Sequence, residues 1–231
     1  MSGFVTKLRR TSERTMNHCP AGLTAEEIRD LVGEAPAFLE VGSHEGSDTV
    51  KFLAAMPGIR IYCFEPDPRP IARFKQTIGD DPRVTLYEQV VADINGLKQF
   101  YASTGKAGHM DDWDYSGSLQ RPTGHLAHSP EIRFKEPVPV VCVRLDTWHR
   151  LNLHERAIDF AWIDIQGSQR AFIAGAQKTL PFIRYLYIEA HHEPMYDGEP
   201  TQEELIALLP GFEPLAVYEL DNILFQHRHD L

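Results

Sequence analysis

From about Ala37 onward, short apolar runs alternate with segments in which apolar residues recur every three or four positions. The short runs predict β-strands, and the spacing of three to four residues predicts amphipathic helices. Strands that alternate with helices form βαβ units, which assemble into a mainly parallel sheet. The strands expected in this chain cover residues 37–41, 60–64, 84–92, 138–145, 158–165 and 183–190.

Helix starts are marked by local capping patterns. Thr24 with Glu27, and Thr201 with Glu204, have the spacing of a capping box, in which each side chain bonds the backbone amide of the other residue. These pairs predict one helix before the first strand and one after the last parallel strand. The helix that follows Gly46 is expected to bury one apolar stripe, Val50, Leu53 and Ala54.

Two turns predict antiparallel hairpins. Asn95-Gly96 is a strong hairpin signal, because both residues tolerate the left-handed backbone that a tight turn needs. Near the end of the chain, Asp221-Asn222 separates two apolar runs in the same way. The strands joined by these turns are expected at 84–92 with 97–101 and at 215–220 with 223–227.

Residues 103–137 have no periodic pattern and are rich in Gly, Pro, Ser, Asp and His. A segment of this length without a helix or strand pattern, inside a compact chain, is usually a functional lid or is disordered. We therefore expect an N-terminal extension with one helix at 1–36. A single domain is expected at 37–231, with a lid or acceptor loop inserted at about 103–137.

The charge balance narrows the class of partner. The chain has 231 residues, with 23 Lys+Arg against 33 Asp+Glu, so its formal net charge is −10. Such a surplus of negative charge repels the phosphates of nucleic acids, which are therefore not expected as partners. No run of about 18 apolar residues is present, so no transmembrane segment is expected.

The three cysteines, Cys19, Cys63 and Cys142, are widely spaced and form no CxxC pair. This pattern indicates neither a disulfide framework nor a zinc or redox site. Residues 1–20 carry basic side chains without an apolar run behind them, unlike a secretory signal. Together these features predict a reduced, cytoplasmic setting.

Candidate chemistry lies where the first two strands end. In open α/β sheets, ligands bind beyond the carboxyl ends of the strands. The first strand leads into Glu40-x-Gly42-x-x-x-Gly46, a glycine turn before a helix, where the backbone can approach a ligand closely. The second strand ends in Glu65, about 20 residues further on, where an acidic side chain can accept hydrogen bonds from ribose hydroxyls. Together these two strand ends predict a cofactor that contains a nucleoside, although each alone could be an ordinary turn or strand end.

A series of segments follows in order along the chain: Phe38-Leu39-Glu40-Val41-Gly42-Ser43-His44-Glu45-Gly46, Tyr62-Cys63-Phe64-Glu65-Pro66, Val91-Ala92-Asp93, Ser116-Gly117-Ser118-Leu119, Leu145-Asp146-Thr147, Ile163-Asp164-Ile165-Gln166-Gly167 and Ala174-Gly175-Ala176. Together these segments resemble the FkbM family of S-adenosylmethionine-dependent O-methyltransferases. The resemblance covers residues 38–189 and implies a class I methyltransferase (Rossmann-like) α/β fold. That fold has seven mostly parallel strands, a C-terminal antiparallel hairpin and helices on both faces.

The resemblance also implies roles for single residues in binding S-adenosylmethionine and its product, S-adenosylhomocysteine. Asp164 would face either the amine of the methionine part or the acceptor hydroxyl. Asp93 could equally be a turn residue before Asn95. The residues implied at the methionine part are Glu40, Gly42, Ser43, His44 and Gly46; those at the ribose and adenine are Glu65, Pro66, Ala92 and Asp93; Ser118 is a further contact on the cofactor side.

The sequence departs from the family pattern at two places. Where the family usually has Ala-Asn-x-Gly after the first glycine, this chain has Ser43-His44-Glu45-Gly46, so an imidazole stands in place of an amide. Where the family usually has Lys-x-Asp-x-Glu-Gly-x-Glu, residues 162–169 read Trp-Ile-Asp-Ile-Gln-Gly-Ser-Gln. A base supplied by the lysine, or a cation held by the two acids, must therefore lie elsewhere here or be absent.

The segment that closes the 183–190 strand is the best source of a general base. An imidazole with a pKa near neutrality can take a proton from the acceptor as the methyl group moves, so His191 and His192 are the candidates, with Asp164 as a third catalytic residue. The alternative is that these are surface polar residues. Asp164, Glu189 and His191 could also hold magnesium or manganese, but their spacing does not require a divalent metal.

The inserted segment combines aromatic rings with carboxylates, as sugar-binding sites do. Rings cover the apolar faces of sugars, and acids accept hydrogen bonds from their hydroxyls. The alternative is a flexible, solvated loop, and His125-x-x-His128 is interpreted as such despite its metal-like spacing. The residues in question are His109, Asp111, Asp112, Trp113, Asp114, Tyr115, His125 and His128.

The sequence therefore predicts an S-adenosylmethionine-dependent O-methyltransferase that acts on a hydroxyl. The expected acceptor is a small molecule or glycan, with a sugar of a polysaccharide, glycolipid or glycosylated metabolite preferred. A homo-oligomer is a further expectation. One alternative is a regulatory paralogue that binds the cofactor without catalysis, as the missing lysine and acids suggest. A nicotinamide-dependent oxidoreductase is a second, although the third glycine of the dinucleotide fingerprint is absent.

Overall fold

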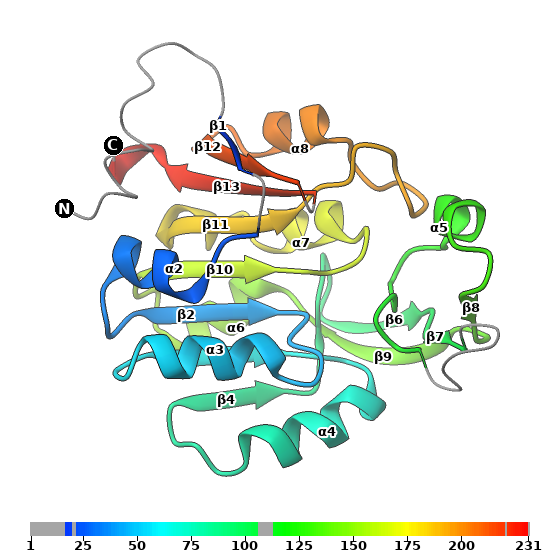
Figure 1. Cartoon of the computed structure of the whole chain (residues 1–231), viewed down its shortest axis with the longest axis horizontal. Coiled ribbons are helices and arrows are strands. Elements are labelled where there is room, and N and C mark those ends of the chain that lie inside the picture. The colour runs from blue at the N-terminus through cyan, green and yellow to red at the C-terminus, as the bar shows by residue number, and fades with distance from the viewer. Residues whose placement is uncertain (1–16, 20–21, 106–112, 220, 231) are drawn as a thin grey trace.

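A computed structural model describes residues 17–19, 22–105, 113–219 and 221–230 (Figure 1). Its centre is an eight-stranded sheet in the order β1-β12-β13-β11-β10-β2-β3-β4. All neighbouring strands are parallel except β13, which runs antiparallel to both β11 and β12. The strands are β1 (Asn17–Cys19), β2 (Ala37–Val41), β3 (Arg60–Phe64), β4 (Val84–Tyr87), β10 (Ile158–Ile163), β11 (Ile183–Glu189), β12 (Phe212–Tyr218) and β13 (Asn222–His227).

Seven of these strands form the mostly parallel sheet with a closing hairpin that the sequence predicts. The eighth, β1, comes from the N-terminal extension and adds to the edge beside β12, where His18 pairs with Val217. The sheet order changes direction at β2, because the chain moves outward to β3 and β4 and then returns to β10 on the other side. Ligands bind at such a switch point, so the carboxyl ends of β2, β3 and β10 frame the site.

Helices cover both faces of the sheet (Figure 1). Neighbouring residues of β2 show why: Phe38 packs in one buried cluster with helices α2, α3 and α4, whereas Leu39 packs in the other with α6, α7 and α8. Successive strand side chains point to opposite faces, so two apolar layers form from one strand. The helices are α2 (Ala25–Val32), α3 (Ser47–Ala55), α4 (Pro68–Ile78), α6 (Leu145–Asn152), α7 (Gln169–Gly175) and α8 (Gln202–Leu208).

The two predicted capping boxes are confirmed at the starts of α2 and α8. The buried stripe predicted for α3 is wrong, because Val50 is 44% exposed and the helix buries Thr49 and Phe52 instead. The physical reason is the buried carboxyl of Glu40 on β2, which requires a hydrogen-bond donor. The Thr49 hydroxyl donates to Glu40 Oε2 at 2.7 Å, so a polar residue occupies a position that apolarity alone would not select.

A smaller sheet corrects two further predictions. The strand expected at 84–92 is divided between β4 in the large sheet and β5 (Val90–Val91) in the small one. Asn95-Gly96 forms no hairpin between its flanking strands, because β9 (Val138–Val143) lies between β5 and β6 (Gly96–Phe100) and pairs with both. A local turn signal cannot reveal that a strand from more than 40 residues away inserts there.

The inserted segment has more structure than its sequence predicts. Strands β7 (Ser103–Thr104) and β8 (Arg133–Phe134) form an antiparallel pair, and α5 (Thr123–His128) lies between them in sequence. Helix α5 packs closely on the loop after β11, where the His125 amide donates to the carbonyl of Met195 at 2.7 Å. In the parts of the chain that the structure describes, no helix has the length and apolar character needed to cross a membrane.

Candidate functional site

A cavity of about 110 Å³, open to solvent, lies at the carboxyl ends of β2, β3 and β10. Its floor comes from the strand ends, and its roof comes from the inserted segment. Six of the residues predicted from sequence for the cofactor line it: Gly42, His44, Glu65, Pro66, Ser118 and Asp164. The other polar lining residues are Asp67, Gln89, Asp114, Tyr115, Gln166 and Ser168.

Gly42 joins the two sides of the cavity floor. Its φ of +86° lies in the left-handed region, and a Cβ at this position would lie 1.7 Å from the carbonyl oxygen of Asp164. Its amide donates to Phe64 at 2.9 Å, while the Asp164 amide donates to Val41 at 2.9 Å. Only glycine meets both demands, because any side chain would overlap the backbone of the strand beside it.

Glu65 ends β3 with its carboxylate held by backbone amides. The amide of His44 donates to Oε2 at 3.0 Å, and the amide of Asp67 donates to Oε1 at 2.9 Å. Burial raises the pKa of Glu65 to about 8, although these two hydrogen bonds oppose the rise. Since a carboxylate has about four acceptor positions, each oxygen keeps capacity for a ligand hydroxyl.

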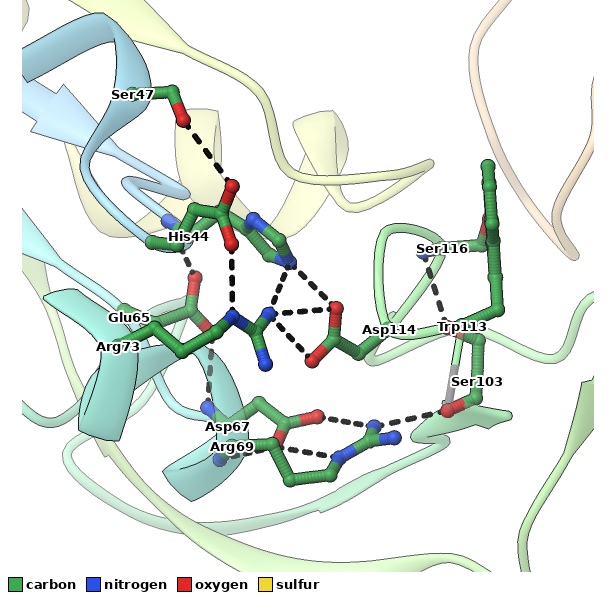
Figure 2. Close-up of polar contacts among 11 residues, drawn as sticks. His44, Ser47, Glu65, Asp67, Arg69, Arg73, Ser103, Trp113, Asp114 and Ser116 are labelled. Atoms are coloured by element: carbon green, nitrogen blue, oxygen red, sulfur yellow. Dashed lines mark hydrogen bonds and ion pairs between the residues drawn. The ribbon is translucent and has the colours of Figure 1, made fainter. Parts of the chain in front are cut away.

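His44 connects the floor to the roof, as Figure 2 shows. We use "clasp" for the group formed by His44, Glu45, Arg73 and Asp114. His44 Nε2 lies 2.8 Å from Oδ1 of Asp114, and Arg73 donates to both Asp114 oxygens at 2.9 and 2.8 Å. Arg73 also donates to Glu45 Oε2 at 2.8 Å. The clasp therefore ties the loop after β2, helix α4 and the inserted segment together at one edge of the cavity.

Asp114 is the centre of the clasp, with a side chain that is only 1% exposed. Burial raises the pKa of this carboxyl, but the hydrogen bonds from Arg73 and His44 outweigh burial and hold the pKa below its usual value. The exposed ring of the next residue, Tyr115, lies 4.2 Å from the His44 ring and 5.0 Å from Trp113. Tyr115, which lines the cavity, therefore forms an aromatic pair with Trp113 beside the clasp.

A second tie holds the same segment. The guanidinium of Arg69, paired with Asp67, donates to the carbonyl of Ser103 at 2.9 Å. The Ser103 hydroxyl accepts the amide of Ser116 at 3.1 Å (Figure 2). The start of the insert is therefore fixed to the residues that follow Glu65.

On the opposite side of the cavity, polar side chains form one connected network. Gln166 donates through Nε2 to Oδ1 of Asp164 at 2.8 Å and to the two oxygens of Glu189 at 3.1 and 3.2 Å. His191 lies next, with Nδ1 at 2.6 Å from Glu199 and Nε2 at 3.4 Å from Glu189. The network runs from Asp164, which lines the cavity, to the loop after β11.

The two candidate histidines have different surroundings. Burial lowers the pKa of His191, but Glu199 and Glu189 reverse this effect and raise it to about 9. His191 therefore holds its proton at neutral pH. Its role as a general base stays a prediction, and a protonated imidazole does not favour that role. The His192 side chain is 74% exposed, 3.8 Å from Asp221. Neither histidine lines the cavity.

The metal alternative gains no support. Within the described residues, no group of three or more His, Cys, Asp or Glu side chains is arranged to hold a metal ion. Asp164 and Glu189 instead share the amide of Gln166, and both nitrogens of His191 face carboxylates.

Five residues predicted for the cofactor lie outside the cavity lining: Glu40, Ser43, Gly46, Ala92 and Asp93. Glu40 accepts hydrogen bonds from Thr49 and Cys63. Gly46 meets the Phe74 side chain, which explains its need to be small. Ala92 comes directly after β5, and its carbonyl lies against Gly175. Asp93 forms an ion pair with Lys98. The chain segment 89–91, just before Ala92, lines the cavity in their place.

The other residues that the sequence singled out in the inserted segment have different surroundings. His109, Asp111 and Asp112 lie outside the described residues. His125 is buried against Phe134 and Tyr196, whereas His128 is exposed. The sequence missed Gln166, which it noted only as a departure from the family pattern, and Gln89, for which no local signal was present.

Comparison with known proteins gives one family and one close relative. The profile of the methyltransferase FkbM domain matches residues 40–220. The 2-O-methyltransferase NoeI of Sinorhizobium fredii is 37% identical over 183 residues, which are 79% of this chain and 74% of that protein.

Solved structures match at lower identity. The pyocyanin biosynthetic protein PhzM is 16% identical, with a TM-score of 0.42; the match covers 89% of this chain, which spans about half (54%) of PhzM. A putative O-methyltransferase from Klebsiella pneumoniae is 15% identical, with a TM-score of 0.49 over 88% of this chain and 78% of that one.

Proposed function

This chain belongs to the FkbM methyltransferase family, and from this premise we propose that it transfers a methyl group from S-adenosylmethionine to a sugar hydroxyl. The sugar would belong to a polysaccharide, a glycolipid or a glycosylated metabolite. The observation that carries the proposal is the 37% identity to a 2-O-methyltransferase over 79% of the chain. Tyr115 in the cavity lining, with Trp113 beside it, supports a sugar, because aromatic rings cover the apolar faces of pyranosides.

The residues of the cavity fit the cofactor. Glu65 can accept hydrogen bonds from both ribose hydroxyls. Among the lining aspartates, Asp67 and Asp114 are paired with Arg69 and Arg73. Asp164, which the neutral amide of Gln166 contacts, is the lining aspartate that favours a cationic ligand. When bound, S-adenosylmethionine supplies an electrophilic methyl group on a cationic sulfonium.

Three catalytic residues were predicted, and of these we assign the proton transfer to Asp164. It is the one that lines the cavity, and Gln166 contacts its Oδ1. We assign Oδ2 to the acceptor: this oxygen takes the hydroxyl proton as the new oxygen–carbon bond forms. Desolvation by the surrounding protein raises the pKa of Asp164, which makes it a stronger base than an aspartate surrounded by water. His191 then keeps a positive charge beside Glu189, and His192 has no assigned step.

Calorimetry and methyl transfer test this proposal. We expect S-adenosylhomocysteine to bind with micromolar affinity, and radiolabelled methyl groups to reach at least one member of a panel of neutral glycans. No binding at millimolar concentration would overturn the cofactor assignment. Binding without transfer to any glycan would favour the regulatory paralogue. A nicotinamide-dependent enzyme would instead bind NADH, which we expect not to bind.

Two further proposals concern the setting. A cytoplasmic location is supported by Cys63 and Cys142, which are buried free thiols. Homo-oligomerisation stays a proposal that sedimentation analysis of the full chain would test.

A further inference from the structure

Gln166 has an unusual backbone for a residue with a side chain. Its φ is +46°, in the left-handed region, where a residue other than glycine costs about 1 kcal/mol. Two contacts hold it there: its carbonyl accepts a hydrogen bond from the hydroxyl of Ser118, and the following Gly167 lies so close to Tyr196 that a Cβ on it would be 2.5 Å from the Tyr196 Cβ. The strain is therefore imposed by the roof of the cavity and by the loop after β11.

The side-chain amide of Gln166 is bonded at both ends. Its Nε2 donates to Asp164 and Glu189, and its Oε1 accepts the Tyr196 hydroxyl at 3.0 Å. Carboxylates in their charged form only accept, and burial raises the pKa of Tyr196 so that this hydroxyl keeps its proton. These neighbours thus fix which end of the Gln166 side-chain amide carries the nitrogen and which carries the oxygen. Tyr196 also lies 3.0 Å from the carbonyl of Ser116, in the roof.

Gln166 therefore stands between the roof and the proposed base. The roof residue Ser118 contacts Gln166 directly, and the roof residue Ser116 is connected to it through Tyr196. Gln166 in turn donates a hydrogen bond to Oδ1 of Asp164. It also lets two carboxylates, Asp164 and Glu189, lie beside one shared donor. A carboxylate at position 166 would add a third negative group at this point and would repel both.

We propose that Gln166 is a positioning residue for methyl transfer, which fixes Asp164 so that Oδ2 faces the acceptor hydroxyl beneath residues 116–118. This inference rests on the proposed function, because it assigns the base of that reaction. The step is balanced: the acceptor oxygen gains the methyl group, its proton passes to Asp164, and the electrons of the broken sulfur–carbon bond stay on sulfur.

The charge state of Asp164 depends on groups from several elements. The charged and titratable groups that face it are Glu189 on β11, His191 in the following loop, His44 in the loop after β2 and Asp48 on α3. The hydrogen bond from Gln166 lowers the pKa of both Asp164 and Glu189. Loss of this bond alone should therefore move their titration to higher pH while the other groups stay in place.

The test compares Gln166→Met, which keeps the length of the side chain but not its hydrogen bonds, with Gln202→Met. Gln202 is a matched control, because its amide donates to the carbonyl of Ala190 at 2.8 Å and lies outside the cavity lining. In the ligand-free protein, carboxyl ¹³C NMR should show Asp164 titrating about one pH unit higher in Gln166→Met and unchanged in Gln202→Met. Asp164→Asn assigns the resonance.

With an acceptor identified, kcat of Gln166→Met should fall at least about tenfold, and the acid limb of its pH profile should move to higher pH. The affinity for S-adenosylhomocysteine should stay within about threefold. Tyr196→Phe, which removes one hydroxyl from the network, should move the same quantities by less and serves as a second variant if Gln166→Met does not fold.

An unchanged Asp164 titration would overturn the inference, and so would a loss of product affinity as large as the loss of kcat. The failure of the proposed function is distinguishable. If the wild type methylates nothing, that function fails, while the NMR titration still supports or overturns the positioning of Asp164 by Gln166.

Discussion

The two sides of the cavity are built in different ways. On the side that we assign to the methyl donor (the donor side), Glu65 is held by the backbone amides of His44 and Asp67, which depend on chain conformation and little on side-chain identity. On the side that we assign to the acceptor (the acceptor side), Asp164 is held by Gln166, a side chain that also reaches Glu189. A site held by backbone amides can keep its geometry through many side-chain substitutions, whereas a site held by side chains changes when a single residue changes.

The largest effect is expected where the two sides meet. Gly42→Ala would place a Cβ 1.7 Å from the Asp164 carbonyl and would strain a φ of +86°. We expect a loss of more than about 3 kcal/mol in the free energy of unfolding. Gly79→Ala is the control, because Gly79 has a positive φ with nothing within 4 Å, and it should cost about 1 kcal/mol. Urea unfolding measures both, and equal losses would contradict the close approach of the two sides.

The clasp gives the next largest effect. Asp114→Ala removes the carboxylate that Arg73 and His44 share, and Arg73 keeps its contact with Glu45. We expect a loss of about 2 kcal/mol in the free energy of unfolding together with about tenfold weaker binding of S-adenosylhomocysteine. Asp48→Ala removes an exposed pair with Lys51 and should cost less than about 0.5 kcal/mol. Unchanged product binding in Asp114→Ala would show that the roof is not needed on the donor side.

The clasp also has a pH signature. The pKa of Asp114 is below its ordinary value in the folded protein, so its contribution is present above the ordinary aspartate pKa and is lost as the pH falls. The stability gap between wild type and Asp114→Asn should therefore narrow below about pH 4. Thermal unfolding from pH 3 to 7 measures this gap, and a constant gap would contradict the assignment.

A matched pair of buried glutamates separates binding from stability. Burial raises the pKa of both Glu40 and Glu65 to about 8. Each therefore favours the folded state most below the unfolded pKa near 4.5, and this contribution is lost as the pH rises through 8. Wild type loses this contribution between pH 5 and 9, so the stability of Glu40→Gln and of Glu65→Gln relative to wild type should each rise by up to about 4 kcal/mol over that range.

Only one of this pair should affect the donor. Glu65→Gln should weaken S-adenosylhomocysteine about tenfold, whereas Glu40→Gln should change its affinity less than about threefold. The reason is that Glu65 lines the cavity and Glu40 bonds Thr49. Calorimetry compares the two variants. A large loss of affinity for S-adenosylhomocysteine in Glu40→Gln would show that Glu40 contributes to the cofactor site.

The smallest effect is expected at His192, which does not line the cavity. His192 is exposed, so His192→Ala should change stability by less than about 0.5 kcal/mol and turnover less than about twofold. A tenfold loss of turnover with unchanged product affinity would instead make His192 the base.

Local signals predicted the local features. The Thr24 and Thr201 capping boxes, the Gly42 turn and Glu65 at the end of β3 each depend on a few neighbouring residues, and the structure has them in place. The Asn95-Gly96 hairpin was wrong for the complementary reason. A turn signal reports the preference of four residues, and the partner strand β9 comes from far along the chain.

The sequence by itself determined most strands and helices of the large sheet, the glycine turn and the family, because each depends on short segments read in chain order. The tertiary structure decided which polar side chains meet. Gln166 reaches Glu189 across 23 positions, and Tyr196 reaches Ser116 across 80. Hydrogen bonds and ion pairs act over about 3 Å in space without regard to sequence separation, so only the folded chain brings these groups together.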